Sequence, residues 1–270
     1  MHITVEDIMD YMENLAPSRL KESYDNVGLM VGDRYHRVKA VLFCLDCTLE
    51  VIKEAKDKNV DMIISHHPLI FRKPSSITTD TLQGKKIIEL IKNNINLYSS
   101  HTNLDSVKSG MNDTMVELLN LDINSVNIIE ESLTKIQGAG IGRIIELKSP
   151  IRSEKLCSVV KEKFNLSSLR FAGELNMDIN KIAMINGSGQ DYFEAARKAG
   201  AQCVITGDTT YHYISDYKEM GLFLIDIGHF SSEWPLFKTI GRNIEKYLKS
   251  QDEEIKVYYS QSEHEPYEIF

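Results

Sequence analysis

Two adjacent histidines, His66 and His67, are the first residues in this chain whose type and position could do chemistry. They follow a largely apolar, strand-like segment with Val60, Met62, Ile63 and Ile64, and they precede Pro68, which ends a strand. Open α/β sheets bind ligands at the carboxyl ends of their strands, so two imidazoles at this position predict a ligand site. The alternative is a pair of hydrogen-bonded or exposed histidines in a loop.

Further imidazoles and carboxylates also follow apolar, strand-like runs. Imidazole and carboxylate together suit Zn, Fe, Mn, Co or Ni better than Ca or Mg. Three histidines and two carboxylates are too many for one tetrahedral site with an open position, but they fit two metal ions with a bridging carboxylate. A metal pair of this kind activates a water and polarises a phosphoryl or carbonyl-like group. The predicted ligands are His66, His67, Asp105, His229 and Glu233.

Two more candidate residues, His101 and Asp208, also follow apolar, strand-like runs. Either could move protons, because a general base must reach the attacked water. His101 could instead orient a ligand through a hydrogen bond. Non-metal alternatives exist for two ligands as well: Asp105 could form an Asx-turn, and Glu233 could favour the first turn of a helix.

The elements that must position these residues form a repeated pattern. A strand over residues 39–46, a helix over 48–58 and a strand over 60–65 make a βαβ unit, which implies a parallel sheet. A third strand over 95–100 runs into His101. In the middle of the chain, glycines at 138–142 lead into a strand over 143–147 that we expect to be antiparallel.

The second half repeats the first. Ile63 and Ile205 are 142 positions apart, as are His66 and Asp208, and the His-x3-acid pairs beginning at His101 and His229 are 128 apart. We therefore expect an α/β fold of two pseudo-repeated βαβ lobes, about residues 1–125 and 126–270, with a mixed sheet in each and the metal site in the cleft between them.

Bulk composition narrows the function classes. The chain has 270 residues and a formal net charge of −8, which argues against a surface that coats nucleic acid. No apolar run is long enough for a membrane span, and the first residues lack a secretory signal pattern. The four cysteines lie mostly in apolar runs, where they behave as structural thiols, so we expect a cytoplasmic compartment.

Six motifs along the whole chain resemble the Nif-three-like dinuclear-metal family, often called GTP cyclohydrolase 1 type 2 homologues. The motifs are Tyr24-Asp25-Asn26-Val27-Gly28-Leu29, Ser65-His66-His67-Pro68, His101-Thr102-Asn103-Leu104-Asp105, Asn186-Gly187-Ser188-Gly189, Thr206-Gly207-Asp208, and Gly228-His229 with Glu233. The family usually has Trp in place of Tyr24, and often Glu in place of Asp208. Neither change touches the predicted metal ligands.

The resemblance implies that the five predicted ligands bind two divalent metals, with Glu233 as a bridge. It also implies a single Nif-three-like domain over residues 1–270, without the inserted domain of some relatives, and a toroidal homohexamer. The predicted function is hydrolysis of a nucleotide-like small molecule; with GTP, the attack would open the imidazole ring of guanine at C8. The alternative is a non-catalytic metal carrier or regulatory scaffold.

Overall fold

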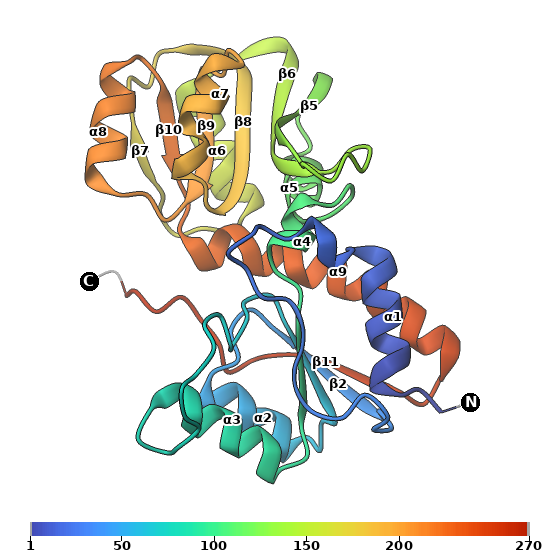
Figure 1. Ribbon diagram of the computed structural model, residues 1–270. Coiled ribbons are helices and arrows are strands. Elements are labelled where there is room, and N and C mark those ends of the chain that lie inside the picture. The colour runs from blue at the N-terminus through green and yellow to red at the C-terminus, as the bar shows by residue number, and fades with distance from the viewer. Residues whose placement is uncertain (1, 269–270) are drawn as a thin grey trace. The chain divides into compact units, whose positions relative to one another are not determined.

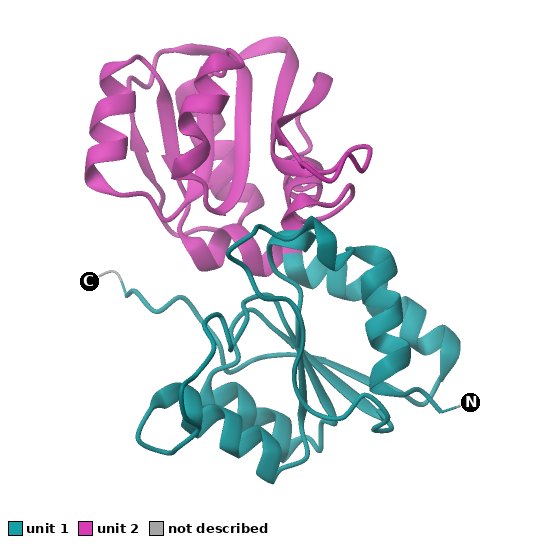
Figure 2. Cartoon of the chain, viewed as in Figure 1, with its two compact units in different colours: residues 1–104, 237–270 teal, residues 105–236 magenta. Residues whose placement is uncertain are grey.

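The structure is a computed structural model that describes residues 2–268. The chain forms two compact units, which Figure 2 shows in different colours. Unit 1 contains the chain up to Leu104 together with the segment from Phe237 onward, and unit 2 contains Asp105–Leu236. The expected boundary near residue 125 therefore differs from the division found.

Unit 1 is built on a five-stranded mixed sheet in the order β1-β4-β3-β2-β11. Its core is a run of parallel strands whose residues are all buried, as expected when helices cover both faces. The antiparallel edge strand β1 pairs with β4, and β11 pairs in parallel with β2. The strands are β1 (Gly28–Val31), β2 (Ala40–Cys44), β3 (Met62–Ser65), β4 (Asn96–Ser99) and β11 (Lys256–Tyr259).

Helices cover both faces of this sheet (Figure 1). The helices α2 (Leu49–Asp57) and α3 (Leu82–Lys92) pack their apolar sides on one face. On the other lie α1 (Val5–Leu15) and the later part of α9 (His229–Gln251), where Phe237 packs against Phe43 of β2. Short helices η1 (Ser18–Leu20) and α4 (Thr102–Ser106) complete the connections.

Unit 2 has a six-stranded mixed sheet in the order β5-β6-β8-β9-β10-β7. Strands β8, β9 and β10 are parallel, β7 is an antiparallel edge, and β5 and β6 form the antiparallel pair on the other side. The strand predicted over residues 143–147 is thus confirmed as part of β6. The strands are β5 (Ile123–Glu131), β6 (Gly140–Arg152), β7 (Arg170–Ala172), β8 (Asp178–Ser188), β9 (Cys203–Gly207) and β10 (Phe223–Asp226).

The helices of unit 2 also lie on both faces of its sheet (Figure 1). The helices α7 (Phe193–Lys198) and α8 (Tyr211–Glu219), with the short η2 (Gln190–Tyr192), pack on an apolar cluster from β6, β8, β9 and β10. The helices α5 (Met111–Leu119) and α6 (Ser153–Lys163) contact β6 or β8 and each other.

The two units repeat the same strand pairing in the same register. In unit 1, Leu42 of β2 lies opposite Ile63 of β3, and 142 positions later Met184 of β8 lies opposite Ile205 of β9. The pairing of β3 with β4 recurs as the pairing of β9 with β10. Residues of β10 lie 128 positions after the equivalent residues of β4. The α/β fold with two mixed sheets is therefore confirmed, and the repeat read from the sequence matches the register of the strands.

The division of the chain has a physical cause. After the long helix α9 the chain returns and adds β11 beside β2, so the last segment belongs to the first sheet. The helix α5, expected in the first lobe, packs instead on β6 and β8 of unit 2.

Among the described residues, no helix is long and apolar enough to cross a bilayer.

Candidate metal centre

Three imidazoles of unit 1 cluster at the carboxyl ends of β3 and β4. One nitrogen from each of His66, His67 and His101 lies within 4.8 Å of the others. His66 is fully buried, and its Nδ1 is 2.8 Å from the carbonyl oxygen of Ser100. A carbonyl only accepts, so Nδ1 carries the proton and Nε2 is the atom with a lone pair for a ligand bond.

Carboxylates hold the other two imidazoles by the same ring nitrogen. His67 Nδ1 is 3.0 Å from Asp46 Oδ1, and His101 Nδ1 is 2.9 Å from Asp25 Oδ1. Asp25 is buried, which by itself raises the pKa of its carboxyl; hydrogen bonds and charge from His101 and Thr102 outweigh this and lower the pKa to about 2. Partners of this kind fix ring orientation and tautomer, as they do around bound metals.

The loop that carries Asp46 is itself held by the C-terminal segment. The carboxylate of Glu263 accepts hydrogen bonds from the backbone N–H groups of Leu45 and Asp46 at 2.8–3.1 Å. Burial raises the pKa of Glu263 to about 7, although those N–H groups act in the opposite direction. A residue more than 200 positions away in sequence thus supports the partner of His67.

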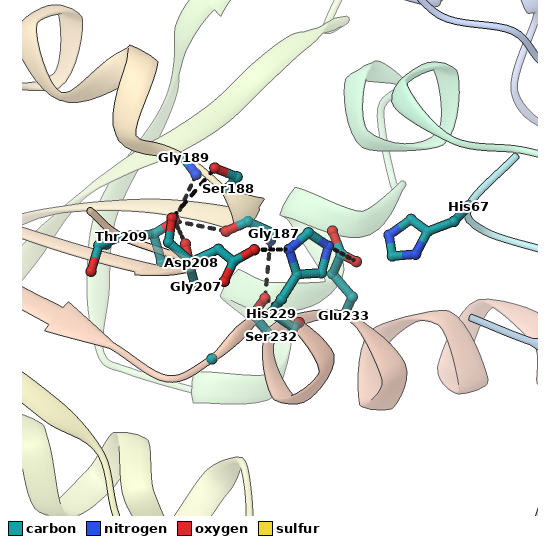
Figure 3. A network of polar contacts seen from close by, with 12 residues as sticks. His67, Gly187, Ser188, Gly189, Gly207, Asp208, Thr209, His229, Ser232 and Glu233 are labelled. Carbon is teal, nitrogen blue, oxygen red and sulfur yellow. Dashed lines mark hydrogen bonds and ion pairs between the residues drawn. The ribbon is translucent and has the colours of Figure 1, made fainter. Parts of the chain in front are cut away.

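In unit 2, His229 lies between two carboxylates (Figure 3). Its Nδ1 is 3.0 Å from Asp208 Oδ2, and its Nε2 is 3.0 Å from Glu233 Oε2, one helical turn along α9. Asp208 is exposed and its backbone is left-handed, with φ of 53°. A non-glycine residue in that region is uncommon, and such conformations concentrate at functional sites.

The buried amide of Asn186 bridges the two carboxylates predicted as ligands. Its Nδ2 is 2.8 Å from Asp105 Oδ1 and 3.1 Å from Glu233 Oε1. Asn112 supports both ends of the arrangement, since it donates to the carbonyl of Asp105 and accepts from the backbone N–H of Asn186. Three side chains from β8, α4 and α9 therefore converge on one point of unit 2.

Gly187 leaves the space that the carboxylate of Glu233 occupies. A Cβ at this position would lie 2.2 Å from Glu233 Oε1 and 3.5 Å from His229 Cε1, and the backbone φ is +60°. Its N–H donates to the hydroxyl of Ser232, which places the turn against the start of α9 (Figure 3). Glycine is therefore required both by conformation and by the close approach.

These donors fit a bound divalent metal. Asp105 and Glu233 are both nearly buried and face the same neutral amide, an arrangement of two like charges that a cation would offset. Nε2 of His229 lies 3.0 Å from the carboxylate of Glu233. Imidazole and carboxylate are the donor types that Zn, Fe, Mn, Co and Ni accept.

Every predicted site residue falls at one of these two clusters. His66, His67 and His101 come together in unit 1, and Asp105, Asp208, His229 and Glu233 come together in unit 2. The contacts of Asp25 and Asn186 were not predicted from the sequence, although both residues belong to the family-like motifs. The one local signal was the glycine after Asn186, which marks a close approach of the backbone.

Comparison with known proteins agrees over the whole chain. The sequence matches the family Duf34/NIF3 (NGG1p interacting factor 3) over residues 3–266. It is 50% identical over 269 residues to a GTP cyclohydrolase 1 type 2 homolog of Clostridium acetobutylicum, covering 100% of both chains. A homolog with the same name in Clostridium perfringens is 51% identical over 265 residues, or 98% of this chain and 99% of that one.

Solved structures show the same fold. Staphylococcus aureus protein SA1388 superposes with a TM-score of 0.88 at 30% identity, covering 99% of each chain. HcgD from Methanocaldococcus jannaschii, solved in its reduced form, superposes with a TM-score of 0.81 at 28% identity, covering 97% of this chain and 99% of that one. The sequence match, the fold and the two clusters of donors together identify this chain as a member of the Duf34/NIF3 family.

Proposed function

We propose that this protein binds two divalent transition-metal ions per chain and uses them to hydrolyse a nucleotide-like substrate. The ligands are His66, His67, Asp105, His229 and Glu233, with Glu233 as the bridge. The observation that carries the proposal is the amide of Asn186, which donates hydrogen bonds to both Asp105 and Glu233. It holds two buried carboxylates where a cation would offset their charge. The name of the clostridial relatives, GTP cyclohydrolase 1 type 2 homolog, supports the substrate class.

The surrounding residues support ligand roles. Ser100, Asp46 and Asp208 each contact Nδ1 of an imidazole, so we assign metal binding to Nε2 of His66, His67 and His229. Nε2 of His229 lies 3.0 Å from Glu233, the carboxylate with which it would share a metal ion. Bound metal ions would supply Lewis acidity and lower the pKa of a water. In this proposal His101, which the buried carboxylate of Asp25 holds, would accept a proton from the attacking water. Asp208 acts on His229 and serves there as a positioning residue.

The first experiment measures the metal content of the purified, untagged chain together with the His66→Ala/Glu233→Ala variant. We expect close to two transition-metal ions per chain in the parent and loss of both in the variant. The exposed His264→Ala substitution is the matched control and should retain the metal. One ion or none in the parent, unchanged by the substitutions, would contradict the dinuclear site.

The second experiment follows GTP by chromatography with each candidate metal. We expect opening of the guanine ring by the parent and the control, and none by the metal-deficient variant. A metal-loaded protein that turns over none of a panel of nucleotides would favour the carrier or scaffold function instead. Equal turnover by the metal-deficient variant would show that the metals do not carry the reaction.

The proposed assembly is a toroidal homohexamer, as the family resemblance implies. One chain has a mass of 30.8 kDa, so light scattering of the purified protein should give a mass of six chains. A monomeric or dimeric mass across the accessible concentration range would contradict this assembly.

A further inference from the structure

A hollow of about 460 Å³ in unit 2 has a lining that differs from the metal ligands. It lies between the edge strand β7, the helix α8 and the carboxyl end of β10. Small-molecule sites occupy about 300–1,000 Å³, and in open α/β sheets they lie at the carboxyl ends of strands. Both the volume and the position therefore suit a small ligand.

Two cations border the hollow. Arg170 on β7 contacts the buried carboxylate of Asp226, with Nη2 2.5 Å from Oδ2. Asp226 is also held by the backbone N–H of Gly228 at 3.0 Å and by Thr209, so it anchors the guanidinium at the rim. Lys218 on α8 adds a second, exposed positive charge. The lining thus carries a net positive charge, which favours an anion.

Aromatic and hydroxyl groups complete the lining. Tyr211, Ser215 and Lys218 follow one another at helical spacing on the same side of α8. Tyr211 is 80% exposed, and its ring makes an edge contact with the adjacent His212, with 5.4 Å between the ring centroids. Phe171 of β7 is half exposed beside the same hollow. Exposed rings next to cations are the combination that stacks a flat heterocycle while binding its phosphate.

A hollow in unit 1 lies beside the equivalent elements, but at the opposite end of the strand, and its lining differs. It has about the same volume, 450 Å³, and lies beside the equivalent edge strand β1 and helix α3. Its helix side is made of Ile87, Leu90 and Ile91, and it opens where the chain enters β4 rather than where a strand ends. The cations and the exposed tyrosine occur only in the hollow of unit 2, among the residues that the structure describes.

The hollow adjoins the candidate metal centre through the chain itself. Thr209 lines it, and the preceding residue, Asp208, contacts His229. On the neighbouring strand, Asp226 also lines the hollow and accepts a hydrogen bond from the backbone N–H of Gly228, the residue before His229. A ligand in the hollow would therefore lie at the same edge of the sheet as the metal ligands of unit 2.

We propose that this hollow binds a phosphorylated aromatic ligand of mononucleotide size, with Arg170 and Lys218 on the phosphate and Tyr211 stacked on the ring. The assignment deepens the proposed function, on which its catalytic meaning rests, because it names where the nucleotide-like substrate is recognised. Binding itself does not depend on turnover.

The test is calorimetric titration of the full-length protein with GMP, inorganic phosphate and guanosine. We expect GMP to bind at least tenfold more tightly than phosphate or guanosine, because only GMP engages both the cations and the ring. Lys218→Met should weaken GMP binding at least tenfold, since a charge-assisted hydrogen bond is lost. Tyr211→Ala should weaken GMP binding several-fold and leave phosphate binding unchanged.

Matched controls are available because the substituted residues are exposed. Lys163→Met removes the same charge from α6, and Tyr35→Ala removes an exposed ring from unit 1; neither residue lines the hollow, so both variants should bind GMP like the parent. The proposal is overturned if the parent shows no saturable GMP binding, if Lys218→Met binds as tightly as the parent, or if phosphate binds as well as GMP.

The His66→Ala/Glu233→Ala variant separates this proposal from the proposed function. If it still binds GMP while Lys218→Met does not, the hollow is the nucleotide site whether or not the metals catalyse hydrolysis. If this variant does not bind GMP while Lys218→Met still does, the metal ligands hold the nucleotide. The role proposed for the hollow is then wrong, although the proposed hydrolysis stands.

Discussion

The two units place histidines by the same strand register but support them differently. His101 and His229 follow equivalent strands, and in each the Nδ1 atom lies about 3 Å from a carboxylate oxygen. In unit 1 that carboxylate is Asp25, which is buried and precedes the edge strand. In unit 2 it is Asp208, which is exposed and occupies the position equivalent to His66. One framework thus supplies imidazoles in unit 1 and mainly carboxylates in unit 2.

The turns that follow the equivalent strands β2 and β8 show the same contrast. In unit 1 the N–H groups of Leu45 and Asp46 donate to the carboxylate of Glu263. In unit 2 the N–H groups of Gly187 and Gly189 donate to the hydroxyls of Ser232 and Thr206. A repeated backbone therefore fixes where the functional groups lie, while the supporting side chains decide how each half responds to pH, charge and substitution.

The largest expected effect concerns two residues that pair with equivalent positions of the two sheets. One pairs with Leu42 of β2 in unit 1 and the other with Met184 of β8 in unit 2. Beside Met184 lies Arg143, which is buried and forms a two-point contact with Asp113; beside Leu42 lies the half-buried Tyr258. Arg143→Met leaves Asp113 without its cation and should lower the free energy of unfolding by about 3 kcal/mol. Tyr258→Leu should lower it by less than about 1.5 kcal/mol.

Urea denaturation followed by circular dichroism measures both changes. Arg152→Met, which removes an exposed arginine of the same strand, is the control and should change stability by less than about 0.5 kcal/mol. An equal loss in Arg143→Met and Tyr258→Leu would mean that the buried ion pair gives unit 2 no particular dependence on charge.

The turn of unit 1 should make stability depend on pH. The pKa of Glu263 is raised from 4.5 to about 7 in the folded chain, so folding favours its protonated form. Its contribution is fully present below the unfolded value of 4.5 and is lost as the pH rises through 7, a change of no more than ~3 kcal/mol. Glu263→Gln should remove this slope from the unfolding free energy measured between pH 5 and 8.

The turn of unit 2 provides the comparison. Ser232→Ala removes the neutral hydroxyl that accepts a hydrogen bond from the backbone N–H of Gly187. It should therefore lower the free energy of unfolding by about 1 kcal/mol at every pH. If the parent chain shows no difference from Glu263→Gln across this pH range, burial does not dominate at Glu263, and its N–H donors hold the carboxyl ionised.

The carboxylate-rich cluster of unit 2 depends on one amide. Asn186→Ala removes the group that faces both Asp105 and Glu233, so their mutual repulsion would displace them. We expect the affinity for Zn²⁺ to fall 10–100-fold, as measured by competition with a chelating dye. Asn176→Ala, an exposed asparagine of the same unit, should bind Zn²⁺ like the parent. Unchanged affinity in Asn186→Ala would show that the bridge does not position the ligands.

Much of this framework could be predicted from the sequence. Continuous apolar runs such as residues 40–45 mark buried parallel strands, and polar residues soon after such runs mark the strand ends, so both the repeat and the candidate residues were predictable. The strand β5 was not, because its half-exposed residues give neither alternation nor a continuous run. The unit boundary was not predictable either, because it depends on the return of the chain to pair β11 with β2.

The supporting residues were harder to predict than the predicted ligands. Asp25 acts on a histidine 76 positions away, and Asn186 meets Asp105 and Glu233 from 81 and 47 positions away. No local pattern encodes such contacts, since the side chains meet only when loops from different strands converge. The predicted ligands lie close to the strand ends in sequence, whereas their partners are placed by tertiary structure.

A last comparison concerns the two carboxylates that contact His101 and His229, and its smaller member is the smallest change expected here. Asp25→Asn replaces one of the two buried oxygens that accept hydrogen bonds from His101 and Thr102 by an NH2 donor, so it should lower the free energy of unfolding by about 1–3 kcal/mol. Asp208→Asn changes an exposed carboxylate that solvent also reaches, so it should lower stability by less than about 0.5 kcal/mol. Urea denaturation of the two variants, with the exposed Asp122→Asn as control, measures the difference. If the two losses are equal, burial does not distinguish the two supporting carboxylates, and the units differ in the identity of their predicted ligands rather than in how firmly each histidine is held.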